Sequence, residues 1–179
     1  MGQSQQIFCS AFKEAFNQRF GEVPWMGGQL SSNMITPSVA KHLRRDGLVK
    51  SSEKIELGDL RVTFHSTDIM VEYESGCASA YNMLKHWPYL RGELEVKPVN
   101  PTLLCCFCDW WSYGAVRDVC HWLMQMMEND PLTRVKVRMF NHGRRTGSPT
   151  ASSSAIQEAL DWIDEETVRA AGPVRISQA

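Results

Sequence analysis

Hydrophobic and polar residues follow one another along this chain in patterns that predict both helices and strands. The first pattern spans residues 7–20, where phenylalanines recur at every fourth position among charged and amide side chains. This spacing places the rings on one face of an amphipathic helix, which Gly21 is suited to end. The rings belong to Phe8, Phe12, Phe16 and Phe20. Such a face can pack on a domain core, or it can contact a partner protein or a membrane.

Short runs of alternating polarity predict the first strands. Residues 54–57 and 60–64 flank Gly58-Asp59, a pair typical of a two-residue hairpin turn, and residues 69–73 continue the pattern. We therefore expect a three-stranded antiparallel meander. Three later runs also have strand character, namely 93–99, 102–107 and 133–140. The second of these is continuously apolar, which indicates a strand covered on both faces.

Helical spacing recurs in four further segments, which are 36–47, 75–87, 113–128 and 155–171. In the 113–128 helix we expect Val116, Val119, Cys120, Leu123 and Met127 to face inward, with Trp122 and Met126 extending the apolar stripe. Strands and helices are mixed without strict alternation. The prediction is an α+β domain, in which a mixed or antiparallel sheet of about five to six strands carries helices packed mainly on one face.

The composition supports one folded domain. The chain has 179 residues, of which 43% are hydrophobic and 22% charged, so a buried core is expected. We assign residues 1–145 to a single α+β domain that includes the 7–20 helix. Residues 146–154 are rich in Gly, Ser, Thr and Pro and are expected to form a flexible linker, followed by an acidic helix at 155–171.

Net charge and hydropathy limit the partners and the cellular locations that we expect for this protein. The formal net charge of −1 gives no global attraction to nucleic acid. The longest apolar run, near residues 103–108, is far shorter than the roughly 20 residues of a spanning helix. No secretory signal pattern is expected at the N-terminus. The six cysteines are expected to be reduced thiols, which indicates a cytoplasmic protein.

Cysteine and histidine spacing raises two chemical hypotheses. Cys105 and Cys108, followed by Cys120 and His121, are residue types that bind zinc, although residues three apart in a strand point to opposite faces. The alternative is that these cysteines are small buried side chains. The second hypothesis is a papain-like hydrolase with Cys108 as nucleophile and His142 as base. The sequence around them matches no peptidase motif, so we assign no catalytic residue and no cofactor.

A basic ribbon follows the 133–140 strand. Arginine and lysine alternate on one face of this strand and continue into the next loop, as Arg134, Lys136, Arg138, Arg144 and Arg145. Such a cluster can bind nucleic acid or another anion. It can also be a solvated sheet face, or it can form ion pairs with the acidic 155–171 helix.

The first residues raise a membrane hypothesis. Met1-Gly2 begins a myristoylation pattern, but Gln6 stands where that pattern has Ser or Thr. An acyl chain on Gly2 together with the 7–20 helix would supply the two signals that stable anchoring requires.

We therefore expect a non-enzymatic cytoplasmic interaction protein that contacts another protein through the Phe-rich helix and the basic ribbon. The alternatives are a matrix-like peripheral membrane protein anchored through Gly2, and the Cys108–His142 hydrolase. Metal binding and enzymatic activity are the less favoured outcomes.

Overall fold

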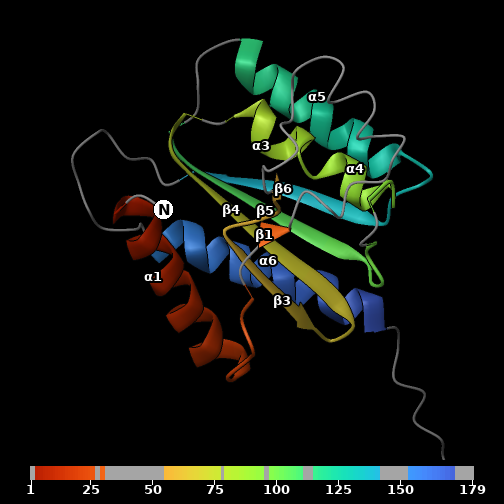
Figure 1. The fold of residues 1–179 in the computed structure, drawn as a ribbon. Helices are drawn as coiled ribbons and strands as arrows, with labels where there is room; N and C mark the ends of the chain where they lie inside the picture. The colour runs from red at the N-terminus through yellow and green to blue at the C-terminus, as the bar shows by residue number, and fades with distance from the viewer. Residues whose placement is uncertain are drawn as a thin grey trace, which may run out of the picture.

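A four-stranded mixed sheet forms the centre of the structure (Figure 1). The computed structural model describes residues 3–26, 29–30, 55–77, 79–94, 97–110, 115–141 and 153–171. The strands, in sheet order, are β3 (Leu60–Phe64), β4 (Thr67–Cys77), β5 (Thr102–Trp110) and β6 (Val135–Asn141). β3 is antiparallel to β4, and the other neighbours are parallel. The α+β class is confirmed, but the main sheet has four strands in this part of the chain instead of five or six.

Helices cover both faces of the sheet, so the prediction of helices mainly on one face is wrong. One face carries α1 (Gln3–Phe20) and α6 (Ser153–Ala171), and the other carries α3 (Ala80–Leu84), α4 (Trp87–Leu90) and α5 (Ala115–Asn129) (Figure 1). The reason is the parallel pairing of β4, β5 and β6, because parallel neighbours require crossover connections. Both crossovers bring their helices to the same face, and α1 and α6 cover the other.

The expected meander is also wrong in its first turn. β2 (Ile55–Glu56) pairs with β1 (Gln29–Leu30) in a separate two-stranded sheet. The outer edge of β3 is occupied by Met26, whose backbone exchanges two hydrogen bonds with Arg61. The hairpin that does form joins β3 to β4 through His65 and Ser66. Both residues have positive φ, 47° and 58°, as a type I′ turn requires.

The Phe-rich face of α1 packs in the core between the sheet and α6. Phe8, Phe12 and Phe16 are at most 1% exposed, and the Phe8 ring stacks on Tyr73 with its centroid 4.5 Å away. Phe12 meets Phe107 of β5 edge to face at 5.7 Å. Since this face is covered by the protein's own sheet, it is not the exposed contact surface that the sequence suggested. Phe20 is partly buried at the edge of the same core, and Gly2 lies outside the described residues.

The second core lies between the sheet and the α3–α5 layer. β5 and β6 contribute Cys106, Cys108, Val135 and Val137 to it, and Met127 of α5 packs against them. On the opposite face of β5, Cys105 and Phe107 belong to the α1 and α6 core. The continuously apolar run of β5 therefore does form a strand buried on both faces, as predicted.

Several expected elements change their bounds. The single 75–87 helix is replaced by the end of β4, α3 and α4, and the described part of 93–99 takes no part in the four-stranded sheet. Residues 36–47 and most of the expected linker lie outside the described residues.

Truncation of a ring in the α1 core should be costly. We expect Phe12→Ala to lower the free energy of unfolding by about 3–5 kcal/mol, because it leaves a cavity between helix and sheet. Val168→Ala on α6, where the side chain is 66% exposed, should change it by less than about 0.5 kcal/mol. Denaturant unfolding of both variants checks this, and equal effects would show that α1 is not part of the core.

Candidate interaction surface

The outer side of α5 exposes a stripe of apolar side chains. Val116 is 43% exposed, Val119 44%, Trp122 56% and Met126 42%. They recur at intervals of three or four residues and therefore lie along one side of the helix. Together we call them the α5 stripe. Leu84 of α3, which packs beside α5, is a further exposed apolar side chain at 43%.

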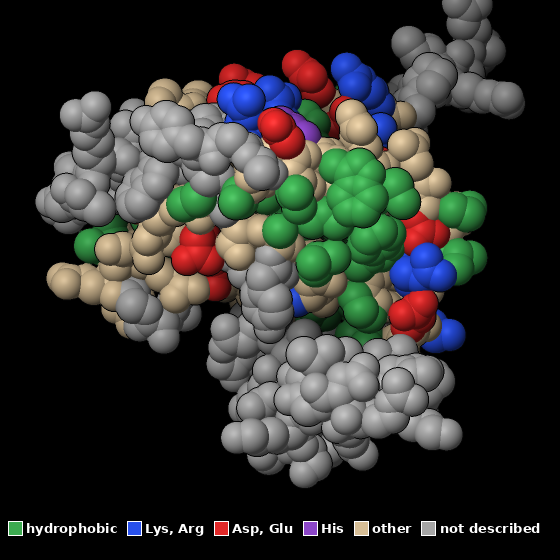
Figure 2. Space-filling view, turned by 90° about the horizontal axis from the view of Figure 1, so that it is seen from above, with side chains coloured by type: hydrophobic (Ala, Val, Ile, Leu, Met, Phe, Trp, Pro, Cys, Tyr) green, Lys and Arg blue, Asp and Glu red, His purple; other side chains and the backbone are tan. Residues whose placement is uncertain are grey.

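Hydrophobic side chains gather on this face of the molecule. Figure 2, which looks down on the layer that α3 and α5 form, shows a continuous hydrophobic patch with few charged side chains inside it. Monomeric soluble proteins rarely leave large apolar patches uncovered, and such patches mark sites of interaction.

The apolar arc of α5 is wider than the sheet can cover, which leaves Val119, Trp122 and Met126 exposed. At about 100° of rotation per residue, the apolar positions of α5 span an arc of roughly 200°. The sheet and α3 cover the half that contains Cys120, Leu123 and Met127, which are 4% exposed or less. Val116 and Val119 were expected to face inward with them and are instead exposed.

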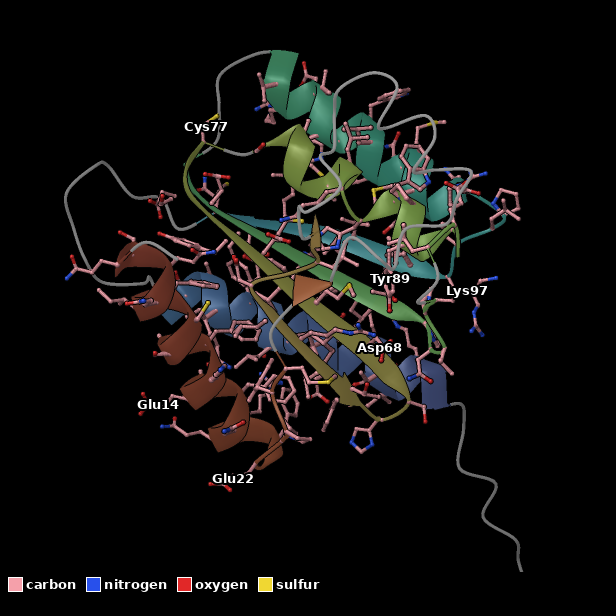
Figure 3. The ribbon with its side chains drawn as sticks, viewed as in Figure 1. Glu14, Glu22, Asp68, Cys77, Tyr89 and Lys97 are labelled. Atoms are coloured by element: carbon pink, nitrogen blue, oxygen red, sulfur yellow. The ribbon has the colours of Figure 1, made fainter. Side chains whose placement is uncertain are left out.

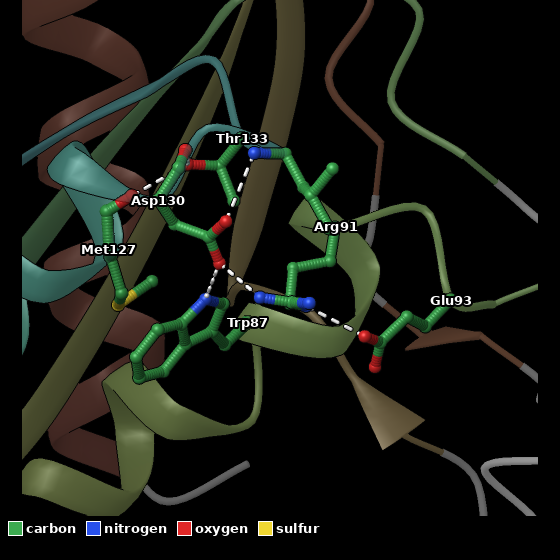
Figure 4. A network of polar contacts seen from close by, with 7 residues as sticks. Trp87, Arg91, Glu93, Met127, Asp130 and Thr133 are labelled. Atoms are coloured by element: carbon green, nitrogen blue, oxygen red, sulfur yellow. Dashed lines mark hydrogen bonds and ion pairs between the residues drawn. The ribbon is translucent and has the colours of Figure 1, made fainter.

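A polar network holds the C-terminal end of α5 (Figure 4). The Asp130 carboxylate accepts hydrogen bonds from Trp87 Nε1 of α4 at 2.8 Å, from the backbone N–H of Leu132 at 3.0 Å and from Arg91. The Leu132 N–H, together with Trp87 and Arg91, lowers the pKa of Asp130 below its ordinary value. Thr133 Oγ1 donates to the carbonyl oxygen of Met127 at 2.6 Å. The network fixes α5 against α4 and the start of β6.

A second polar cluster lies inside the core, around Glu72 of β4. Its Oε1 atom accepts hydrogen bonds from the Gly58 N–H at 2.7 Å, from Lys85 Nζ at 2.7 Å and from His86 Nε2 at 2.8 Å. Burial alone would raise the pKa of Glu72, but the hydrogen bond from His86 and the charge of Lys85 lower it below its ordinary value. Burial lowers the pKa of His86, which is fully enclosed, so a neutral ring donates to an ionised carboxylate.

Gly58 is required at this point by geometry. Its φ of +84° is unfavourable for other residues, and a Cβ atom there would lie 2.9 Å from the carbonyl oxygen of Leu60. The next residue, Asp59, accepts hydrogen bonds from the Tyr73 N–H at 2.8 Å and from Gln5 of α1. The cluster thus connects α1, the start of β3, β4 and the α3–α4 connection.

The cysteines are placed in ways that separate the predicted zinc ligands. Cys105 and Cys108 lie in the cores on opposite faces of the sheet. Cys120 is on the buried side of α5, and His121 is on its exposed side. Residues three apart in β5 therefore cannot share one ion. Burial raises the pKa of the Cys105 and Cys106 thiols, which keeps them protonated. Within the described residues, no cluster of three or more His, Cys, Asp or Glu side chains is arranged to hold a metal ion.

Cys108 occupies a core position and not an open site. It is 1% exposed, and its Sγ atom lies 3.8 Å from the carbonyl oxygen of Phe140, to which it donates. Its expected partner His142 lies outside the described residues. The structure therefore does not describe how Cys108 and His142 lie relative to each other, and the burial of Cys108 does not support the hydrolase hypothesis.

The basic ribbon is partly engaged within the molecule. Arg138 donates to Glu158 of α6 at 2.8 Å, and Arg134 donates to the carbonyl oxygen of Val99 at 2.9 Å. Lys136 is exposed. The acidic helix therefore does supply a partner to this face, one of the alternatives that the sequence left open. Arg144 and Arg145 lie outside the described residues.

Comparisons with known proteins give no family. No family model matches the chain, and neither the curated proteins nor the solved structures contain a match. Among the described residues, no helix is long and apolar enough to cross a membrane.

The α5 stripe is the surface that sequence reasoning missed. The apolar spacing of the helix was recognised, but all of its apolar residues were assigned to the core or its margin. The available signal was the width of the arc, because an arc of roughly 200° exceeds what one packing face usually needs. Trp122, beside polar His121 and Asp118, lies at the far margin of that arc.

The Asp59 carboxyl should give the fold a defined pH dependence. Burial, followed by the charge of Glu72, raises its pKa from 3.8 to about 6. The folded state therefore binds its proton more tightly than the unfolded state, and stability falls as pH rises between these two values. We expect wild type to lose stability relative to Asp59→Asn from about pH 4 to pH 6, with no further change above. Unfolding curves across this range check the slope, and a difference that stays constant or favours wild type at higher pH would contradict it.

Proposed function

We propose that this protein is a non-enzymatic binding protein and that it docks another protein onto the α5 stripe. The observation that carries the proposal is the half-exposed Trp122 among Val116, Val119 and Met126 on a helix that the fold already anchors. Tryptophan is the side chain most often found to dominate the energy of protein interfaces.

The energetics favour an anchoring role for Trp122. Covering the exposed half of a tryptophan side chain would contribute roughly 2–3 kcal/mol of transfer free energy. The neighbouring valines and Met126 would exclude water around that anchor, and the flexible Met126 side chain adapts to the shape of a partner. Because Asp130 and Thr133 hold the end of α5 in place, little ordering of this helix is needed on binding.

The charged residues of α5 favour a protein over an anionic membrane. The exposed polar residues of α5 are of mixed sign, with Arg117, Asp118 and Glu128 among them, and Arg117 lies 3.5 Å from Asp118. A helix that binds a membrane surface usually carries Lys and Arg on both margins of its apolar face. The apolar face of α1, the other proposed membrane contact, packs on the sheet.

Site-specific photo-cross-linking tests the proposal. A benzoylphenylalanine placed at Gln125, an exposed position beside the stripe, should yield a discrete cross-linked protein in cells that make this chain. The same group at Val168, which is 66% exposed on α6, serves as the matched control and should not yield it.

The purified pair then decides the role of the stripe. Trp122→Ala should weaken binding of the captured protein by at least about tenfold, because it removes the anchor. Val168→Ala should leave the affinity unchanged. Identical products from both positions, or full affinity of Trp122→Ala, would overturn the proposal.

A further inference from the structure

Two rows of side chains run along α5, one on its inner side and one on its outer side. In each row, steps of three and four residues alternate. The inner row contains Val116, Cys120, Leu123 and Met127, and its last three members are buried. The outer row contains Val119, Trp122, Met126 and Asn129, and all four are exposed. Figure 3 shows side chains that project from α5 on the side away from the sheet.

The outer row keeps to one side of α5 because its members form two pairs seven residues apart, Val119 with Met126 and Trp122 with Asn129. A repeat of seven residues is the spacing on which two helices pack side by side. Ten positions separate Val119 from Asn129, so the row is about 15 Å long. Trp122, the largest side chain of the row, is flanked by Val119 and Met126.

The spacing of the outer row distinguishes the kinds of segment that can pack along it. Successive members of the row are about 5 Å apart along the helix axis, and the turns of a second helix repeat every 5.4 Å or so, roughly the same distance. Side chains on one face of an extended strand instead repeat about every 6.7 Å. Over three steps a strand would be out of register by about 5 Å, a whole position, and a helix by only about 1 Å. Of the two, only a helix matches the row along its length.

We propose that the partner of the α5 stripe contributes an amphipathic α-helix, which packs lengthwise along the outer row. This inference rests on the proposed function, because it names the part of the partner that the stripe binds. A partner helix of about three turns would cover the row. The large Trp122 ring requires a small residue opposite it, because facing helices pack large side chains against small ones.

The charge beside the outer row adds a second requirement. Asp118 and Gln125 are exposed and lie along the open margin of the row, since each is three or four residues from Trp122. The Asp118 side chain is 70% exposed, and its contact with Arg117 is 3.5 Å long. Such an exposed ion pair contributes little, so Asp118 is available to a cation of the partner. We therefore expect a lysine or arginine on the partner helix opposite Asp118.

Two photo-cross-links test whether the bound segment is a helix. Benzoylphenylalanine at Asp118 and, in a second sample, at Gln125 of the full chain should capture the same protein, and mass spectrometry locates the residue that each captures. The two positions are seven residues apart on α5. The captured residues should therefore lie about seven positions apart within one segment of the partner, which has the same rise per residue. An extended segment would place them about three positions apart, and that spacing would overturn the proposal.

The remaining outcomes separate this inference from the proposed function. Captured residues within this chain's own sequence would make the occupant a second copy and would exclude the partner helix. A spacing that fits no helix, in a protein whose binding still depends on Trp122, would overturn the helix and leave the docking proposal intact. If neither position captures a protein, or if Trp122→Ala binds with full affinity, both are wrong.

A substitution at the end of the outer row tests how far the contact extends. Asn129 lies about 10 Å from Trp122 along the helix axis, so only an elongated partner contacts both. Asn129→Lys should weaken binding of the captured protein by about fivefold or more, because it places a charge against the partner helix. Val168→Lys introduces the same charge on α6, where the side chain is 66% exposed, and should bind as wild type does. Equal affinities of the two variants would confine the contact to the middle of the row and contradict the proposal.

Discussion

One buried carboxylate oxygen joins the turn before β3, the strand β4 and the connection between α3 and α4. Glu72 Oε1 accepts hydrogen bonds from Gly58, Lys85 and His86, which precede β3 or follow α3. A charge removed from water is tolerated only where such donors surround it. The position of α3 and α4 over the sheet therefore depends on Glu72, and α5 packs in turn on α3. Through these contacts the buried charge supports α3, and α3 is one of the elements against which α5 packs.

The apolar side chains form two groups, one that covers the sheet and one that is exposed on α5. The sheet requires an apolar layer on each face, which α1 and α6 provide on one side and α3, α4 and α5 provide on the other. Once Cys120, Leu123 and Met127 are packed, no other element in the described part of the chain buries the rest of the apolar side of α5. The residues left over, Trp122 foremost among them, are each at least 42% exposed. Their exposure makes physical sense if a partner covers them.

Local patterns predicted the elements better than they predicted the contacts between them. The continuous apolar run of β5 and the alternating polarity of β6 were sufficient to place both strands. A strand buried on both faces is apolar throughout, and a strand buried on one face alternates between apolar and polar residues. The prediction of a hairpin turn at Gly58-Asp59 was wrong. The Gly58 N–H instead donates a hydrogen bond to Glu72, fourteen positions along the chain, and local sequence patterns do not predict such a contact. The exposed side of α5 was missed for the same reason, since periodicity identifies an apolar face but not what covers it.

The most direct measurement compares adjacent residues on α5. If the inner half of the helix holds the fold and the outer half is kept for a partner, Leu123→Ala should lower the free energy of unfolding of the isolated protein by about 2–5 kcal/mol. Trp122→Ala should lower it by less than about 1 kcal/mol, although it removes the larger side chain. Denaturant unfolding of the two variants under identical conditions gives both values. A loss for Trp122→Ala as large as that for Leu123→Ala would show that Trp122 belongs to the core, and the proposed docking surface would have no basis.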